Sequence, residues 1–225
     1  MPPAKRAKAD RVEVPYQKPV PEEFYLVPME TIDKYQKLQA AFLSRTIAPL
    51  CLLYGPRQFG KTTIGHRLRT LLAAVPSIRA IYMSLTPSDV KTEEDFWLAL
   101  SITVGEETRS SKEFDIIFSR HKKSLWLAID EMDNMFQNEE LTSNFMETLR
   151  GWQPRKYFLG FLGLGSHDLL NMHMKLKGGS SASPFNLGEV FQAKPFSKKQ
   201  MKGYFKQIQA RYPFRKSTRQ AIMAY

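Results

Sequence analysis

Gly55 begins a run of eight residues whose types and spacing suit the binding of phosphate. The run reads Gly55, Pro56, Arg57, Gln58, Phe59, Gly60, Lys61 and Thr62, and Thr63 completes the candidate nucleotide-binding residues. Glycines let the backbone wrap an anion, so that successive N–H groups and the N-terminus of a following helix point at its oxygens. At this spacing a lysine reaches the β- and γ-phosphates and the Thr62 hydroxyl can ligate Mg²⁺. Thr63 is expected to cap or pack, and the alternative for the whole run is a glycine-rich turn without nucleotide.

Two acidic residues supply a second half for such a site. The apolar run 125–129 ends directly in Asp130 and Glu131. In this pattern Asp130 would hold Mg²⁺ through its water, and Glu131 would act as the catalytic residue that polarises the attacking water. Asp133 follows two residues later, and we expect it to be a solvated acid in a loop or at a helix start.

A third polar position follows the next apolar run. The segment 158–165 ends at Ser166, which is a candidate catalytic residue because a small polar side chain at a strand tip can hydrogen-bond the γ-phosphate or the attacking water. An N-cap for the segment that follows is an equally good explanation of Ser166.

The sequence around these residues alternates helix and strand signals. Apolar residues at helical spacing, from Ile32 to Phe42, predict a helix before the first strand. Short apolar runs predict strands at 49–54, 80–84, 124–129, 157–164 and 190–193. Helices are predicted between them at 61–74, 93–104, 111–121 and 139–150, with Thr92 and Ser111 as the caps of the second and third. This rhythm predicts an α/β fold with a mostly parallel sheet covered on both sides.

Composition excludes several classes of protein. No apolar run approaches the ~18 residues that span a bilayer, and the basic N-terminus has no apolar stretch behind it, as a secretory signal would. The single cysteine, Cys51, cannot form an internal disulfide and is expected to be inert core. The four histidines, His66, His121, His167 and His173, lack metal-ligand spacing. We expect Trp97, Trp126 and Trp152 to pack in the core, and the protein to be soluble and intracellular.

The net charge of +11 is concentrated at the two ends of the sequence. Residues 1–20 carry +3, residues 21–171 carry −2, and residues 172–225 carry +10. Residues 1–29 are rich in proline and are expected to form a disordered basic arm. Within it Lys5, Arg6 and Lys8 have the spacing of a nuclear localisation signal, which predicts an import receptor as partner and a nuclear rather than cytoplasmic location. A solvated tail, or a basic arm that contacts nucleic acid, is the alternative.

The C-terminal part changes to helical signals. Ser197 and Gln200 form a capping box before an apolar face of Met201, Tyr204, Phe205 and Ile208. A second box, Ser217 with Gln220, is followed by barely two turns before Tyr225. The sequence therefore predicts a domain at 30–194 and the truncated start of a helical lid at 195–225, unless the last helix is naturally short. Its basic residues suggest nucleic acid or an acidic partner.

These motifs together resemble the AAA+-related P-loop ATPases. The resemblance rests on the phosphate-binding run, on Ile129-Asp130-Glu131, on Gly165-Ser166 and on Pro195-Phe196-Ser197, and it covers about residues 30–212. The sequence is most similar to the archaeal-type and STAND-like group, with fungal AAA-ATPase-like and Crinkler-type NTPases as neighbours. The resemblance implies a P-loop NTPase three-layer sandwich with the start of a small helical lid, and slow ATP hydrolysis with Mg²⁺ as a conformational switch or assembly signal.

One feature departs from that family. Its ring-forming members place an arginine finger after the strand that ends at Ser166, where this sequence has Lys175 and Lys177 but no arginine before Gly178. Either hydrolysis is slow, or the arginine comes from Arg150, Arg155 or a partner. The lid arginine that such proteins use could be Arg211, Arg215 or Arg219. Arg57 could contact phosphate, but an ion pair on the surface is expected.

The sequence therefore predicts an Mg²⁺-dependent ATPase. The alternative is a nonhydrolytic scaffold or nucleic-acid-binding nuclear protein that nucleotide only stabilises. The preference for ATP over GTP, the oligomeric state and the coupled process stay open.

Overall fold

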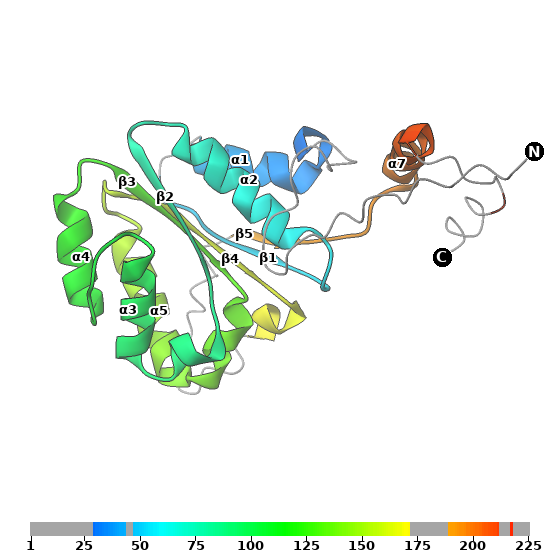
Figure 1. Cartoon of the computed structure of the whole chain (residues 1–225). Coiled ribbons are helices and arrows are strands. Elements are labelled where there is room, and N and C mark those ends of the chain that lie inside the picture. Colours follow the sequence, from blue (N-terminus) through cyan, green and yellow to red (C-terminus); the bar gives the residue numbers. More distant parts are fainter. Residues whose placement is uncertain (1–28, 44–46, 172–188, 212–216, 218–225) are drawn as a thin grey trace, which may run out of the picture.

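Five parallel strands form the centre of the molecule in the order β2-β3-β4-β1-β5 (Figure 1). The computed structural model describes residues 29–43, 47–171, 189–211 and 217. The strands are β1 (Leu50–Tyr54), β2 (Ile78–Ser84), β3 (Ser124–Asp130), β4 (Phe158–Gly165) and β5 (Glu189–Gln192). The α-helices are α1 (Asp33–Leu43), α2 (Lys61–Ala73), α3 (Glu93–Ile102), α4 (Ser111–Arg120), α5 (Glu139–Trp152) and α7 (Lys198–Arg211). Short 3₁₀ turns are η2 (Met29–Thr31), η3 (Pro87–Val90), η4 (Met132–Gln137) and η5 (His167–Asn171).

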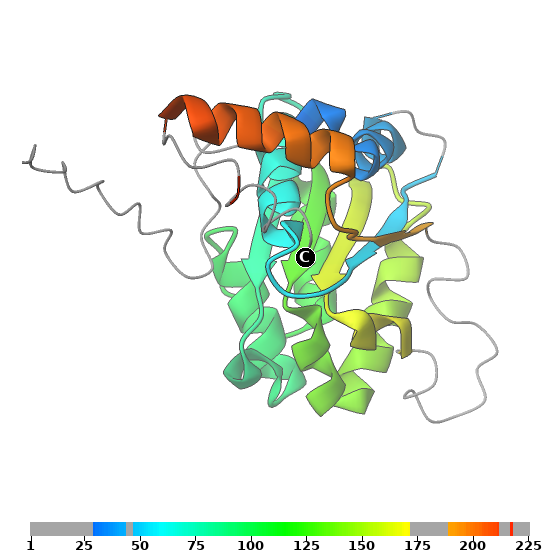
Figure 2. The same ribbon diagram turned by 90° about the vertical axis from the view of Figure 1, so that its right-hand side faces the viewer.

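Helices cover both faces of the sheet, with α1 and α2 on one face and α3, α4 and α5 on the other (Figures 1 and 2). Side chains alternate between these faces along each strand. In β1, Leu50 and Leu52 pack toward α3 and α5, whereas Cys51 and Leu53 pack toward α1 and α2. This arrangement confirms the predicted α/β fold.

The buried residues behave as the sequence predicted. Burial raises the pKa of the Cys51 thiol to about 12, so this group stays protonated and unreactive. Trp97, Trp126 and Trp152 are all buried in the two cores. Within the described part of the chain, no helix is long and apolar enough to cross a membrane.

Element ends differ slightly from those predicted, and the differences come from tertiary pairing and capping. The strand expected at 80–84 begins at Ile78, because Ile78 pairs with Ser124 at the start of β3. The prediction that Ser111 caps α4 is wrong: Ser110 is the cap, and its hydroxyl accepts the N–H of Glu113. Thr92 caps α3 as predicted, by accepting the N–H of Asp95.

The start of the C-terminal helix is as predicted. Ser197 accepts the N–H of Gln200 at 3.2 Å, and the Gln200 side chain accepts the N–H of Ser197 at 2.8 Å. Phe205 is buried, as expected for the apolar face of α7. The second capping box at 217–220, the basic arm at 1–28 and the side chains of Tyr204 and Ile208 lie outside what the structure describes.

Gly160 lies at the irregularity where the pairing of β3 with β4 shifts register. Its φ is +150°, and a Cβ there would lie 2.8 Å from the carbonyl oxygen of Pro49. That oxygen already accepts the N–H of Phe161, so the backbone has no room to move away. Only glycine fits both the conformation and the space.

We predict that Gly160→Ala lowers the free energy of unfolding by about 1–3 kcal/mol, because it adds backbone strain and a clash with backbone. Urea denaturation would measure the change. The matched control is Gly151→Ala in α5, where a Cβ meets nothing within 4 Å and where helix propensity favours alanine by about 0.5–1 kcal/mol. Equal effects at the two positions would contradict this account of Gly160.

Candidate functional site

The phosphate-binding run lies between β1 and α2, as its pattern predicted. Gln58 and Gly60 have positive φ values of 65° and 76°, and Gly60 is the N-cap of α2. The left-handed conformation at Gly60 turns the chain so that α2 begins at Lys61, and a Cβ on Gly60 would meet nothing within 4 Å. The space beside Gly60 is therefore open, at the start of a 13-residue helix whose first N–H groups have no side-chain cap.

Lys61 is folded back onto this loop. Its ammonium donates to the carbonyl oxygens of Gly55 at 2.9 Å and Pro56 at 2.8 Å. Burial lowers the pKa of Lys61, while Asp130, Glu131 and Asp133 act in the opposite direction. The charge of Lys61 is thus held inside the loop, among the three carboxylates at the end of β3.

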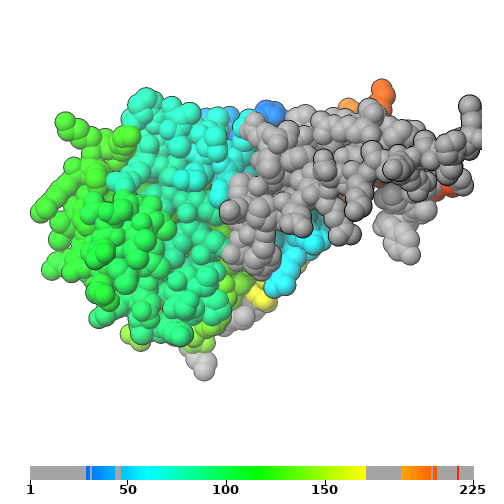
Figure 3. Space-filling view, viewed as in Figure 1, coloured from blue at the N-terminus to red at the C-terminus, as the bar shows by residue number. Residues whose placement is uncertain are grey.

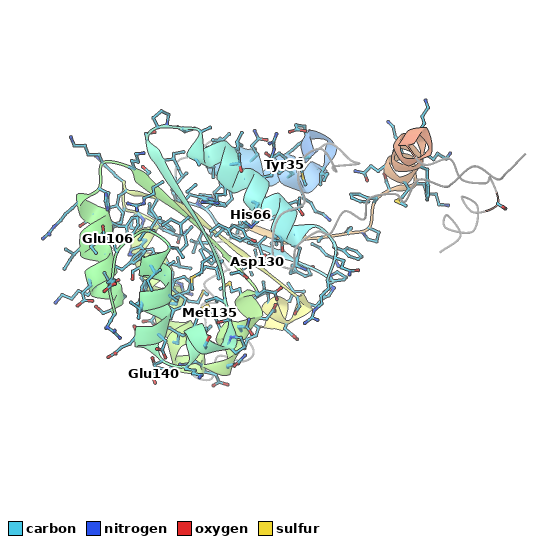
Figure 4. All side chains as sticks on the ribbon, viewed as in Figure 1. Tyr35, His66, Glu106, Asp130, Met135 and Glu140 are labelled. Carbon is cyan, nitrogen blue, oxygen red and sulfur yellow. The ribbon has the colours of Figure 1, made fainter. Side chains whose placement is uncertain are left out.

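Asp130 joins three elements at the carboxyl edge of the sheet. One oxygen, Oδ2, accepts the hydroxyl of Thr62 in the first turn of α2 at 2.6 Å and the hydroxyl of Tyr82 in β2 at 2.5 Å. The other, Oδ1, accepts the N–H of Glu131 at 2.9 Å. Figure 4 labels Asp130 beside His66, below α2. The structure therefore brings together Thr62 and Asp130, the two residues that the sequence predicted to serve a metal.

Tyr82 is the residue of this site that sequence reasoning missed. Its ring stacks on His66 with centroids 3.9 Å apart, and it lies against the backbone of α2 where Gly65 leaves room. Burial, and then the negative charge of Asp130, raise the pKa of Tyr82 well above its ordinary value, so the hydroxyl remains a donor. Burial also lowers the pKa of His66, with Arg69 adding to the effect. Tyr82 and Thr62 thus hold the same oxygen of Asp130.

Glu131 follows Asp130 in a left-handed conformation, with φ 52° and ψ 37°. Non-glycine residues rarely adopt this region, and such strain is common at functional sites. Burial raises the pKa of Glu131, and the charges of Asp130 and Asp133 raise it further, whereas Lys61 lowers it. Glu131 is thus a half-buried carboxyl beside two others and a lysine, and its basicity is above that of an ordinary glutamate.

Ser166 and Asp133 are joined to each other. The hydroxyl of Ser166 donates to Asp133 Oδ1 at 2.9 Å, and the Ser166 N–H donates to Oδ2 at 2.7 Å. The same hydroxyl accepts the N–H of Asp168 at 3.0 Å, which is the capping interaction that the sequence left as an alternative for Ser166. Asp133 lies in the first turn of η4, as expected, but it is not simply solvated: its carboxylate fastens the end of β4 to η4. The expectation of a solvated acid failed because β4 lies beside β3.

Comparison with known proteins gives matches among solved structures. The Aeropyrum pernix ORC2 protein, solved as ADPNP–ADP complexes, matches with a TM-score of 0.60 and 13% identity, over 89% of this chain and 55% of that protein. The A. pernix ORC1 protein in complex with DNA matches at 0.56 and 16%, over 87% and 51%. Domain III of the Thermotoga maritima replication initiation protein DnaA matches at 0.55 and 15%, over 84% and 74%. This chain therefore spans about half the length of the two archaeal proteins. No protein-family model matches the sequence, and no curated protein does.

The chain shares the fold of these solved structures. The resemblance that the sequence motifs suggested is confirmed in the arrangement of its parallel sheet and helices. Within this fold, the phosphate-binding run, Asp130 and Ser166 lie at the carboxyl ends of three strands that are adjacent in space, β1, β3 and β4.

Two of the candidate arginines, Arg150 and Arg155, lie apart from this edge. Arg155 is 3.8 Å from Asp115 and lies over the ring of Tyr157, just before β4 begins, and Arg150 is in the last turn of α5. Both are near the amino ends of the strands. Arg57 is exposed in the phosphate-binding run and makes no ion pair among the described residues, so the expected surface ion pair has no support. Lys175, Lys177, Arg215 and Arg219 lie outside the described residues, and Arg211 is the last residue of α7.

We predict that Glu131→Gln raises the melting temperature at neutral pH. A carboxyl whose pKa is higher in the folded than in the unfolded state binds more protons when folded, so its ionisation opposes folding as the pH rises. Glutamine keeps the size and the backbone strain but removes the charge. The gain should vanish at acidic pH, below the ordinary range of glutamate pKa values, where both states are protonated.

Thermal unfolding followed by circular dichroism would measure these melting temperatures. The exposed Glu147→Gln in α5 removes the same charge away from the cluster and is the matched control. An equal gain in the control, or a lower melting temperature for Glu131→Gln at neutral pH, would show that the carboxylate cluster does not strain the folded state.

Proposed function

We propose that this protein binds ATP with Mg²⁺ at the phosphate-binding run and hydrolyses it to ADP and phosphate, slowly, as a conformational switch. The observation that carries the proposal is the hydrogen bond between Thr62 and Asp130 at 2.6 Å. It joins two motifs far apart in the sequence, at the end of an open phosphate loop. The A. pernix ORC2 protein of the same fold was solved with ADPNP and ADP, which adds support.

The residues present fit these ligands. Gly60 and the first turn of α2 offer backbone N–H groups and a helix N-terminus for phosphate oxygens. Thr62 and Asp130 are hard oxygen donors, and Mg²⁺ commonly takes only one or two such groups beside water and substrate phosphates. When bound, Mg²⁺ would neutralise phosphate charge.

Each protein group then has a role that its surroundings support. Lys61 would exchange its two carbonyl acceptors, Gly55 and Pro56, for phosphate oxygens. Tyr82 would orient Asp130. Glu131 would accept a hydrogen bond from the attacking water, and the raised pKa of Glu131 suits a general base. Ser166, held by Asp133 at the next strand, would orient the water or the γ-phosphate.

Slow turnover follows from the placement of the arginines. Arg150 and Arg155 lie at the opposite edge of the sheet, and Arg155 is paired with Asp115. Arg57 is the exposed arginine of the loop itself, and we propose that it contacts phosphate. Without an arginine from a partner, hydrolysis would lack a contribution that is commonly worth about 10³–10⁵ in rate.

We expect Lys61→Ala to abolish binding of a fluorescent ATP analogue, because it removes the loop's charge and its phosphate donor. Glu131→Gln should keep binding but stop phosphate release. Titration by fluorescence and a phosphate-release assay would measure the two effects, with the exposed Lys91→Ala as control. Wild-type binding in Lys61→Ala, together with unchanged turnover in Glu131→Gln, would refute the proposal.

A nonhydrolytic nucleic-acid-binding protein is the second candidate function, and α7 favours it. Lys198, Lys202 and Lys206 are exposed and recur every four residues, so they share one side of the helix. The A. pernix ORC1 protein of the same fold was solved with DNA. Import through Lys5, Arg6 and Lys8, in the part that is not described, stays a proposal for location.

Charge reversal on α7 tests this second candidate. If it is correct, the variant Lys198→Glu, Lys202→Glu, Lys206→Glu should bind duplex DNA more weakly than wild type, with a smaller salt dependence, whether or not ATP is present. Fluorescence anisotropy at two salt concentrations would measure this. Unaltered affinity and salt dependence would remove α7 as a nucleic-acid surface.

A further inference from the structure

A hollow lined only by basic side chains lies at the amino edge of the sheet, far from the phosphate-binding run. It has a volume of about 430 Å³ and is lined by Arg79, Arg120, His121, Lys122 and Lys123. Arg79 is at the start of β2, and the other four end α4 and lead into β3. Because β3 runs from Ser124 to Asp130, the hollow and the candidate ATP site are about 20 Å apart, at opposite ends of one strand.

Arg79 is fixed in place at the back of this hollow. Its guanidinium donates to the carbonyl oxygen of Val104, lies 3.4 Å from His121 Nε2, and sits 5.9 Å from the centre of the Phe118 ring. Since a guanidinium only donates, the contact with His121 makes Nε2 the acceptor. Arg79 thus presents an ordered positive charge rather than a freely moving one.

No described carboxylate forms an ion pair with these side chains. The ion pairs of the described residues include none of the five lining residues. Asp115, on the same helix, is already engaged by Arg155 and by the hydroxyl of Tyr157. Arg120 is in the last turn of α4, where the helix dipole stabilises a positive charge. Arg79 belongs to the strand β2, however, so the dipole of one helix does not explain the whole cluster.

The positive surface continues beyond the hollow to the next strand. Ser124 Oγ donates to the carbonyl oxygen of Lys156 at 3.4 Å, so the exposed Lys156 lies beside the start of β3. Basic side chains therefore lie at the amino ends of three adjacent strands, β2, β3 and β4. Measured across the strands, these three ends span roughly 10 Å. Figure 3 shows the green surface of α3 and α4 at the left-hand end of the molecule.

We propose that this basic edge binds the phosphodiester backbone of nucleic acid, without regard to base sequence. A small phosphorylated ligand is usually enclosed by its pocket, whereas Arg120, Lys122 and Lys123 around this hollow are exposed. Exposed lysines spread over several strands instead suit a polymer with regularly repeated charges. The surface is separate from α7 and does not depend on nucleotide binding.

The test uses the full chain with Arg120→Glu, Lys122→Glu and Lys123→Glu combined. Binding of a labelled DNA duplex, measured by anisotropy at a series of salt concentrations, should weaken roughly tenfold or more at low salt. The slope of log affinity against log salt should become shallower by about 1 for each phosphate that the variant no longer neutralises. The variant Lys91→Glu, Lys112→Glu reverses two exposed charges elsewhere and should bind as wild type.

Two further measurements keep the outcome clear. Lys122→Gln with Lys123→Gln removes charge without adding any, and circular dichroism would show whether each variant is folded. Affinity for the fluorescent ATP analogue should not change, which separates this surface from the candidate ATP site. Unchanged DNA binding in the folded variants would overturn the proposal. The proposal would also be overturned if the variants bound DNA as wild type does but bound more weakly to vesicles of phosphatidylserine and phosphatidylcholine, or to polyglutamate. Such a result would assign the edge to a membrane or to an acidic protein.

Discussion

The hydrogen-bonded carboxylate of Asp130 is the constraint on which the candidate site depends. It accepts the hydroxyls of Thr62 and Tyr82 and the N–H of Glu131, and so ties α2, β2 and β3 at one point. A buried carboxylate is stable only when its oxygens are satisfied, and this network supplies three donors. Lys61 lies near this carboxylate, and Glu131 follows it in a left-handed conformation.

The same strand separates two regions of opposite charge. Asp130, Glu131 and Asp133 lie at the carboxyl end of β3, whereas Lys122 and Lys123 precede its amino end beside Arg79. Residues 21–171 are nearly neutral in total, with 17 basic and 19 acidic residues. A near-zero net charge therefore conceals a separation of charge, with acidic residues at one end of β3 and basic residues at the other.

Much of the site was predictable from local pattern. The phosphate-binding run, the apolar run before Asp130 and the cap at Thr92 each depend on residues a few positions apart, and the structure has each of these elements where expected. Ser110 took the cap expected of Ser111, since two adjacent serines offer the same signal and only the backbone selects one. Asp133 was misjudged for a different reason, because its partner Ser166 belongs to another strand.

The sequence by itself determined the α/β fold class, the order of helices and strands and the position of the phosphate-binding run between a strand and a helix, since short apolar runs, glycines and caps act on neighbouring backbone. Only the tertiary structure decided that Tyr82 holds Asp130, that Ser166 binds Asp133, and that Arg79 meets residues 120–123. Those contacts require the strand order β2-β3-β4-β1-β5, and no local signal specifies which strands become neighbours. Pairing of distant strands is set by the packing of the whole core.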